Sequence, residues 1–371
     1  MLTRFEVTNF KNFEKKLVLD FTETNNYKFN EECIAHDTVN KALVYGHNGT
    51  GKSNLGYAIF DLISHLTIKN INAEHYTNYL NANSNDTVAS FCYEFKFISG
   101  VVKYTYTKKN VTTLMKETLE INGKLFAEVD REKDEDATIN AVGAETLKKN
   151  IENSKVSIVT YINKNTLLDE NNNDNKTFFD FIKFVDSMLF FRSLNDGNTY
   201  MGHTAGERLI DQDIIEHDHV NDFEKFLNKL GISCKLDILK LGDTDILVFI
   251  IGEKRIPFYD IASSGTRSLA LFYFWFQRMQ EEHLNFVFID EFDAFYHFEL
   301  AKNIIEILKE LDIQVILTTH NTALMTNELL RPDCYFLIGD NQIKSLSNRT
   351  EKELREAHNI EKMYKAHSFG I

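Results

Sequence analysis

Cysteine is scarce in this sequence. Four cysteines are spread over 371 residues, and no two of them form a C-x-x-C pair: Cys33, Cys92, Cys234 and Cys334. This spacing indicates neither a zinc site, which needs closely spaced ligand pairs, nor a disulfide framework, which is dense in cysteine. We therefore expect a reducing compartment.

Long hydrophobic runs and a secretion signal are also missing. The most apolar stretch, Leu269 to Phe276, is too short to cross a bilayer and is followed by a charged run over residues 277–282. The first residues, MLTRFEVTNF, alternate charged and apolar side chains, whereas a signal peptide places a charged region before an apolar one. These patterns predict a cytoplasmic protein without a membrane segment.

Positive charge is in deficit. Lysine and arginine number 41 against 55 acidic residues, which gives a formal net charge of −14. Binding of nucleic acid over the whole surface is disfavoured, because such binding neutralises phosphates with basic side chains. DNA contact through a local basic groove stays open, although a run of charges is more often a solvated surface. The lysines considered for such a groove are Lys108, Lys109, Lys148 and Lys149.

Apolar and aromatic side chains, in contrast, are plentiful. Hydrophobic residues make up 43% of the chain and aromatic residues 12%, with 30 phenylalanines. A disordered chain does not carry this composition, so we expect a globular protein throughout. The length allows two or three average domains, or one large α/β domain with insertions.

The first part of the chain is predicted to be mostly β-structure. Residues 3–21 alternate with the period of a β-hairpin, and residues 90–129 alternate as an antiparallel sheet with turns at Gly100 and Gly123. Between them, a short apolar strand at 42–45 runs into a glycine-rich turn and then a helical pattern over 54–66. The charged residues 130–155 are expected to be helical, and 156–162 to form a buried strand.

The second part alternates helices and strands, which is typical of a parallel sheet in an α/β fold. Before it, helices are predicted over 178–191 and 220–230. The later order is strands within 232–258, a helix at 265–282, a strand at 286–289, a helix at 299–311, and strands at 315–318 and 335–338. We predict three units: residues 1–164, a helical insertion at 165–230, and residues 231–371.

The sequence GHNGTGKS, Gly46 to Ser53, matches the pattern G-x-x-x-x-G-K-[ST] in full. In this motif glycines turn backbone N–H groups inward around phosphate oxygens, the lysine reaches the β and γ phosphates, and the last hydroxyl holds Mg²⁺. The pattern predicts an ATP and Mg²⁺ site, with Ser53 as a metal ligand. The predicted nucleotide-binding residues of the loop are Asn48, Gly49, Gly51, Lys52 and Ser53.

An apolar strand followed by two acids, Phe286 to Glu291, comes later in the chain. Ligand chemistry in such sheets lies at the carboxyl ends of the strands. We therefore assign Asp290 to the Mg²⁺ shell and Glu291 to polarising the attacking water. A strand ending in an acidic turn is common, and the assignment depends on the upstream glycine loop.

Two further segments complete the set. Ser263, in SSGTR, stands at the start of an apolar helix and is at least an N-cap. Because of its position shortly before the acidic strand, we favour a second role, in which Ser263 and Gly265 face the γ-phosphate of ATP bound to another protomer. The strand at 315–318 leads to His320, for which we predict a catalytic contact with the γ-phosphate.

This ordered set resembles the ATP-binding-cassette (ABC) type of P-loop NTPase head, the group that includes the SMC, RecF-like and overcoming-lysogenization-defect-like ATPases. Residues 9–13, NFKNF, resemble the NFKSF opening of those heads and add Asn12 to the nucleotide-binding residues, and SSGTR resembles their LSGGQ signature. Arg331-Pro332-Asp333 and the final residues 359–371 are similar to the endings of stand-alone ATPase subunits of prokaryotic anti-phage systems such as PARIS and Septu. The resemblance implies a mixed central sheet, an antiparallel β-subdomain and a helical insertion.

The sequence departs from these heads in two places. No glutamine precedes Gln212, so the Q-loop glutamine of the group has no counterpart after the P-loop. His297 stands where many heads carry an aspartate, and Phe298 where a proline often follows.

The resemblance implies an ATP-binding and hydrolysing switch subunit, a homodimer or higher even oligomer closing around two ATP molecules. It would respond to a phage-derived trigger and control an effector, a nuclease or toxin encoded nearby, since the chain itself shows no separate acid cluster for nuclease chemistry. The alternative is a RecF-like DNA-repair or recombination ATPase that binds DNA directly. A small-molecule P-loop kinase is disfavoured, because SSGTR and His320 would then have no role.

Overall fold

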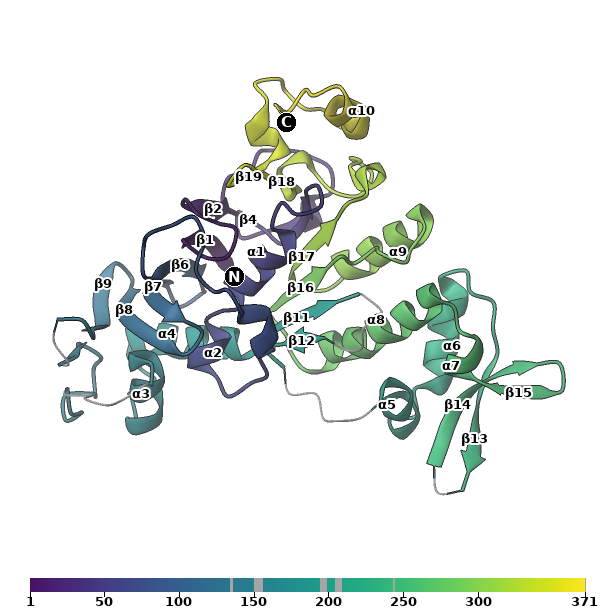
Figure 1. Cartoon of the computed structure of the whole chain (residues 1–371), viewed down its shortest axis with the longest axis horizontal. Helices are drawn as coiled ribbons and strands as arrows, with labels where there is room; N and C mark the ends of the chain where they lie inside the picture. Colours follow the sequence, from purple (N-terminus) through teal and green to yellow (C-terminus); the bar gives the residue numbers. More distant parts are fainter. Residues whose placement is uncertain (134–135, 150–155, 194–198, 204–208, 243, 371) are drawn as a thin grey trace.

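The computed structural model describes residues 1–133, 136–149, 156–193, 199–203, 209–242 and 244–370. Figure 1 shows a three-cornered molecule in which the amino terminus lies near the middle. An antiparallel sheet forms the left corner, the carboxyl-terminal segment the top, and a small three-stranded sheet the right corner. Within the described ranges, no helix combines the length and the apolar character that a membrane span requires.

A mixed seven-stranded sheet forms the centre of the molecule. Five neighbouring strands run parallel, and one antiparallel strand closes each edge. The inner strands are buried along their whole length, as expected for a parallel sheet covered on both faces. In spatial order the strands are β12 (Tyr200–Met201), β11 (Met188–Arg192), β16 (Phe286–Asp290), β17 (Gln314–Thr319), β5 (Lys41–Tyr45), β18 (Tyr335–Gly339) and β19 (Gln342–Ser345).

A second seven-stranded sheet is antiparallel throughout and lies beside the first. It confirms the hairpin predicted over 3–21 and the antiparallel strands predicted over 90–129. Together the two sheets confirm the predicted α/β class with a mixed central sheet and an antiparallel β-subdomain. The spatial order is β10 (Thr138–Ile139), β9 (Lys124–Asp130), β8 (Thr113–Ile121), β7 (Val101–Asn110), β6 (Ala89–Lys96), β1 (Leu2–Thr8) and β2 (Leu17–Asp20).

The helices that follow the central strands begin and end close to the predicted positions. The pattern predicted as one helix over 54–66 forms two, because the chain turns at 60–62, where backbone hydrogen bonds join residues three apart instead of four. These helices are α1 (Lys52–Ile59), α2 (Ile63–Leu66), α6 (Val220–Lys229), α8 (Ser264–Glu281) and α9 (Phe298–Lys309).

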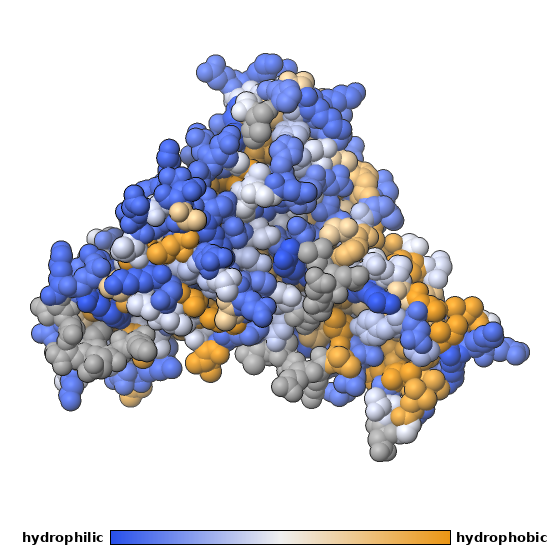
Figure 2. All heavy atoms as spheres, viewed as in Figure 1, coloured by the Kyte–Doolittle hydropathy of each residue, from blue (hydrophilic) through white to orange (hydrophobic). Residues whose placement is uncertain are grey.

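A third sheet occupies the right corner in Figure 1, next to the start of α8. Figure 2 shows apolar residues gathered over this corner. The sheet consists of β13 (Leu236–Leu241), β14 (Thr244–Ile251) and β15 (Lys254–Pro257), with α5 (Ile210–Glu216) and α7 (Phe258–Ile261) beside it. Smaller elements elsewhere in the chain include the hairpin β3 (Ile34–Ala35) with β4 (Thr38–Val39), and α10 (Ile360–Lys365).

Three predictions of local structure are wrong. The described part of 130–155 contains the end of β9, the short β10 and turns instead of a helix, while 134–135 and 150–155 lie outside the described residues. The strand predicted at 156–162 is α3 (Ile158–Asn165), whose first turn is capped by Ser157. The helix predicted over 178–191 is α4 (Asn173–Asp186) followed by β11 of the central sheet. The three-unit division stays a prediction, and β11 comes from its middle unit.

A buried ion pair ties the end of the α1 segment to the antiparallel sheet. Lys108 Nζ lies 2.8 Å from Asp61 Oδ2, and both side chains are fully buried. Tyr79 and Tyr106 donate further hydrogen bonds to the Asp61 carboxylate, each at 2.9 Å. Burial lowers the pKa of Lys108, while Asp61 opposes that shift. The solvated surface that we favoured for Lys108 is therefore wrong, and this lysine is withdrawn from the DNA candidates.

We expect Lys108→Met to lower the free energy of unfolding by about 3–5 kcal/mol, because it leaves the Asp61 carboxylate buried without its counter-ion. Urea denaturation measures the loss. Lys103→Met on the same strand is the matched control, since its contact with Glu94 is 3.9 Å long and half exposed, and it should cost less than about 1 kcal/mol. Equal losses in the two variants would contradict the importance of the buried pair.

Candidate functional site

The glycine loop lies between the end of β5 and the start of α1, as the motif predicts. Gly49 and Gly51 have φ angles of 81° and 102°, a conformation that side chains disfavour. A Cβ atom at Gly51 would lie 2.3 Å from the Asn12 side chain. These two positions therefore need glycine, one for its backbone angle and the other for both angle and space.

Asn12 lies directly against this loop. Its Nδ2 donates to the Thr50 carbonyl at 3.3 Å, and its Oδ1 accepts from Asn54 Nδ2 at 2.7 Å. The segment that carries Asn12 is held in place by the Asn9 side chain, which donates to the carbonyls of Asp86 and Val88. The structure thus places Asn12 beside the phosphate loop.

Lys52 begins α1 with a nearly buried side chain. Its Nζ donates to the Gly46 carbonyl at 2.6 Å and the His47 carbonyl at 3.1 Å, and lies 3.0 Å from His320 Nδ1. Burial lowers the pKa of Lys52, and the nearby carboxylate of Asp290 opposes the shift. The ammonium group therefore lies at the loop and donates to two backbone carbonyls, and phosphate oxygens could accept these hydrogen bonds instead.

Asp290 ends β16 and is fully buried. Its Oδ2 accepts from Ser53 Oγ at 2.7 Å, and its Oδ1 accepts from Thr318 Oγ1 at 2.7 Å. Burial raises the pKa of Asp290, and the charge of Arg192 acts against that rise. A hydroxyl and a carboxylate in contact are the hard oxygen donors that Mg²⁺ prefers, so Ser53 and Asp290 fit a magnesium site.

Glu291 follows with a left-handed backbone, at a φ of 49°. Such a conformation costs a non-glycine residue about 1–3 kcal/mol and often marks a functional position. Its N–H donates to Thr318 Oγ1 at 2.7 Å. The carboxylate is partly exposed, and its Oε1 lies 3.6 Å from His320 Nε2. His320 therefore stands between Lys52 on one side and Glu291 on the other.

Two residues of this site were missed in the sequence. Arg192, at the end of β11, lies opposite Asp290 in the strand register and contacts the carboxylates of Asp290 and Glu291. Thr318 bridges Asp290 and the backbone of Glu291. A signal for Arg192 was present, because MLFFR is an apolar run ending in a charge, like FVFID, but it was assigned to a helix.

Ser263 and Gly265 lie at the start of α8, away from the loop. Ser263 Oγ accepts from the Thr266 N–H at 3.2 Å, which is the predicted helix cap. Both residues line a surface cavity of about 460 Å³ together with Lys229 and His297. Within the described ranges, no hydrogen bond or ion pair joins them to residues 46–53. Figure 1 shows the start of α8 beside α7, far from α1.

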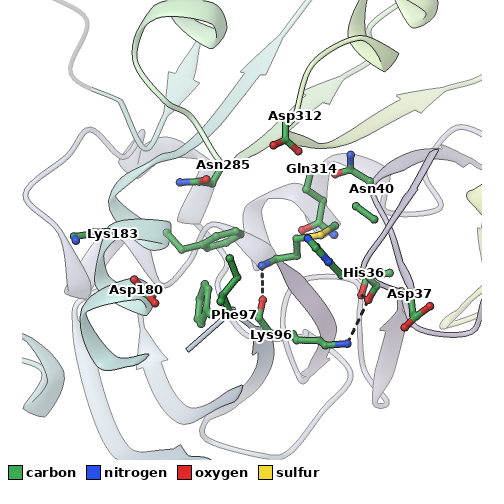
Figure 3. A pocket seen from close by; sticks show the side chains of 15 residues that line it. His36, Asp37, Asn40, Lys96, Phe97, Asp180, Lys183, Asn285, Asp312 and Gln314 are labelled. Carbon is green, nitrogen blue, oxygen red and sulfur yellow. Dashed lines mark hydrogen bonds between the residues drawn. The ribbon is translucent and has the colours of Figure 1, made fainter. Parts of the chain in front are cut away.

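A cavity of about 700 Å³ lies at the opposite, amino-terminal edge of the central strands. Figure 3 shows Asn40, Asn285 and Gln314, which precede or begin β5, β16 and β17, facing the β6 end near Lys96 and Phe97. Gln314 is already engaged, since its Nε2 donates to the carbonyls of Leu2 and Val39. Because the cavity lies at the amino-terminal ends of these strands, it is separate from the site at their carboxyl ends.

The arrangement defines a P-loop nucleotide-binding domain. A family model described as "AAA domain, putative AbiEii toxin, Type IV TA system" matches residues 41–326, which include the glycine loop, the acidic strand and His320. The chain belongs to this family of AAA domains, and is thus a P-loop ATPase domain by family. No curated protein matches the chain.

Solved structures of SMC heads are similar over nearly the whole chain, at low identity. An Smc head bound to the C-terminal winged-helix domain of ScpA shares 15% identity with a TM-score of 0.47, covering 94% of this chain and 98% of that one. The SMC head domain from Thermotoga maritima shares 15% with a TM-score of 0.44, covering 92% and 97%. The Pyrococcus furiosus Smc head with an extended coiled coil, bound to the C-terminal domain of ScpA, shares 13% with a TM-score of 0.49, covering 94% and 97%.

We expect Lys52→Ala to weaken ATP binding roughly a hundredfold, because the charge-assisted hydrogen bonds it removes contribute about 3 kcal/mol together. Isothermal calorimetry with Mg²⁺ and ATP measures the affinity. Lys16→Ala, at an exposed lysine of the β1–β2 hairpin, is the control and should bind ATP normally. Unchanged affinity in Lys52→Ala would contradict the assignment of the phosphate loop.

Proposed function

We propose that this protein binds Mg²⁺ and ATP, hydrolyses the ATP, and uses the cycle as a switch. The supporting observation is that side chains from three separate segments, Lys52, Asp290 with Glu291, and His320, meet at one edge of the central sheet. The sequence places them far apart, and the parallel strands bring Lys52 Nζ to 3.0 Å from His320 Nδ1 and His320 Nε2 to 3.6 Å from Glu291 Oε1.

In this proposal the phosphates are bound by the loop and by the start of α1. The N–H groups of Asn48, Gly49 and Gly51 turn toward the β-phosphate, and the helix dipole of α1 favours the negative charge. Lys52 exchanges its carbonyl contacts for phosphate oxygens. Ser53 and Asp290 hold Mg²⁺, which supplies charge neutralisation when it is bound. Asn12 keeps the loop in place.

Glu291 is the proposed general base. Its carboxylate is partly exposed, so a water molecule has access to it, and it lies at the end of a strand that also carries Asp290. His320 lies on the side of Glu291 that faces Lys52, where it would contact the γ-phosphate. In this arrangement Glu291 orients and deprotonates the attacking water while Lys52 and His320 stabilise the charge on the transferred phosphoryl group.

We further propose that a second copy completes the site. Ser263 and Gly265 begin a long helix whose N–H groups favour an anion, yet α8 starts away from the P-loop of its own chain. A dimer, or a higher even oligomer, would bring the start of α8 of one copy to the ATP of the other. Two ATP molecules would then lie between two heads.

The proposed role of the switch is control of a separate effector, a nuclease or toxin, in an anti-phage defence system, with a phage-derived trigger. The support is the ordered motif set and the family, whose description names a toxin and a toxin–antitoxin system. The burial of Lys108 removes one of the four lysines considered for a DNA-binding groove.

We expect Glu291→Gln to bind ATP with wild-type affinity but to hydrolyse it about 10²–10⁴ times more slowly, because only the water-activating carboxylate is lost. Phosphate release measures the rate, and light scattering detects the closed dimer that should accumulate with ATP. Glu310→Gln, at the exposed end of α9, is the control. Wild-type turnover in Glu291→Gln would show that the base is another residue.

The shared site can be tested with two inactive variants, Lys52→Ala and Ser263→Arg. In a heterodimer of the two, one composite site carries both lesions and the other carries neither. We therefore expect ATPase activity to return on mixing, up to half of the wild-type rate per heterodimer.

Native mass spectrometry shows whether heterodimers have formed. If they form and the mixture stays inactive, two independently firing shared sites are ruled out. Full activity of Ser263→Arg alone would contradict the proposal more directly, because SSGTR would then be an ordinary helix cap.

A further inference from the structure

Arg192 places a positive charge at the carboxylate pair of the proposed metal site. Its Nε lies 3.0 Å from Asp290 Oδ2, and a terminal nitrogen lies 3.3 Å from Glu291 Oε2. The Arg192 side chain is 24% exposed, whereas Asp290 is fully buried. Two adjacent carboxylates repel each other when both are ionised, and this guanidinium group, together with the nearby Lys52 ammonium, offsets that repulsion.

Arg192 contacts the Asp290 oxygen that faces Ser53. Asp290 Oδ2, next to Arg192, is the same atom that accepts the hydrogen bond of Ser53 Oγ. Ser53 and Asp290 are the residues whose donor chemistry fits Mg²⁺. A cation that binds between them therefore meets the guanidinium group at its own ligand.

The ion pair between Arg192 and Asp290 lacks a well-directed hydrogen bond. Although Nε is within ion-pair distance of Oδ2, its buried N–H is not directed at an acceptor and makes no hydrogen bond. The interaction is thus mainly one of charge, which a divalent ion can replace. A fully directed, bidentate pair would resist such replacement more strongly.

Two other side chains, Tyr57 and His75, lie near Arg192. The phenol of Tyr57 lies close enough to Arg192 to feel its charge, and the Tyr57 ring stacks on His75 with centroids 4.6 Å apart. His75 Nε2 is buried without a hydrogen-bond partner. Burial, with the positive charge of Arg192 close by, lowers the pKa of His75. A neutral imidazole and a phenol oxygen can accept a guanidinium group that moves away from the carboxylates.

We propose that Arg192 is a resident counter-ion of Asp290 and Glu291 that competes with the divalent metal for Asp290, and that the metal entering with ATP displaces it. The inference rests on the proposed function, because it assumes that Ser53 and Asp290 take Mg²⁺. Arg192 acts as a positioning residue: it holds the two carboxylates in place in the nucleotide-free protein, and it lowers their affinity for metal alone.

The test is metal binding without nucleotide. Mn²⁺ replaces Mg²⁺ as the probe, since loss of the free-ion signal in electron paramagnetic resonance gives its affinity. Removal of a competing positive charge next to the site should make Arg192→Gln bind Mn²⁺ at least about tenfold more tightly than the wild type. Arg192→Lys keeps a charge but not the planar fork, and should fall between the two.

Arg278→Gln is the matched control, because Arg278 is also a mostly buried arginine paired with an aspartate, Asp213, at 2.7 Å. It should bind Mn²⁺ as the wild type does. Trp275, the single tryptophan, is buried and packs on Phe191 next to Arg192, so its emission maximum reports whether each Arg192 variant is folded there. Should Arg192→Gln fail this check, Arg192→Lys alone carries the test.

Two results would overturn the inference. Unchanged Mn²⁺ affinity in both Arg192 variants would make Arg192 a structural ion pair only. Weaker Mn²⁺ or Mg²⁺-ATP binding in Arg192→Gln would make it a supporting or phosphate-contacting residue instead of a competitor. Failure of the proposed function is distinguished by the wild type itself, which would then bind no Mg²⁺-ATP in calorimetry whatever the Arg192 variants do.

Discussion

The buried carboxylate of Asp290 is the constraint around which the site is assembled. A charge removed from water needs hydrogen bonds or a counter-ion, and Asp290 receives them from Ser53, Thr318 and Arg192. These three residues belong to the start of α1 and to the strands on either side of β16. The Asp290 side chain therefore links the phosphate loop to three neighbouring strands of the central sheet.

The neighbouring acid shows the opposite arrangement. Glu291 follows the end of the strand, has a left-handed backbone conformation, and its carboxylate is partly exposed to solvent. Two consecutive acids thus have different environments, one suited to holding a cation and the other to handling water. The hydroxyl of Thr318 links them, because it donates to Asp290 and accepts from the Glu291 backbone.

The sequence was most informative where the signal is local. Residues 46–53 follow each other in the chain, and Asp290 and His320 each end an apolar run, so both could be placed on the sheet edge from strand periodicity. Arg192 was not recognised as a site residue because 178–191 is apolar at both helical and strand spacing and was predicted to be a helix. Pairing with the distant strand β16 makes 188–192 a strand instead. Lys108 was misread although it is in phase with Val102, Tyr104 and Tyr106, whose face is buried. Where Ser263 and Gly265 act cannot be read from one chain, since their proposed partner is on another.

The short helix α1 connects two parts of the molecule that differ in chemistry. It begins at the phosphate loop with Lys52 and ends two residues before Asp61, whose carboxylate is held by the antiparallel sheet. Eight residues of α-helix span only about 12 Å, so one short continuous helix joins the loop to the segment that carries Asp61. If a ligand bound at the loop stabilises the antiparallel sheet through this helix, thermodynamic reciprocity requires that a protein bound to that sheet change the affinity of the loop by the same factor. The antiparallel sheet is therefore connected to the nucleotide site through α1.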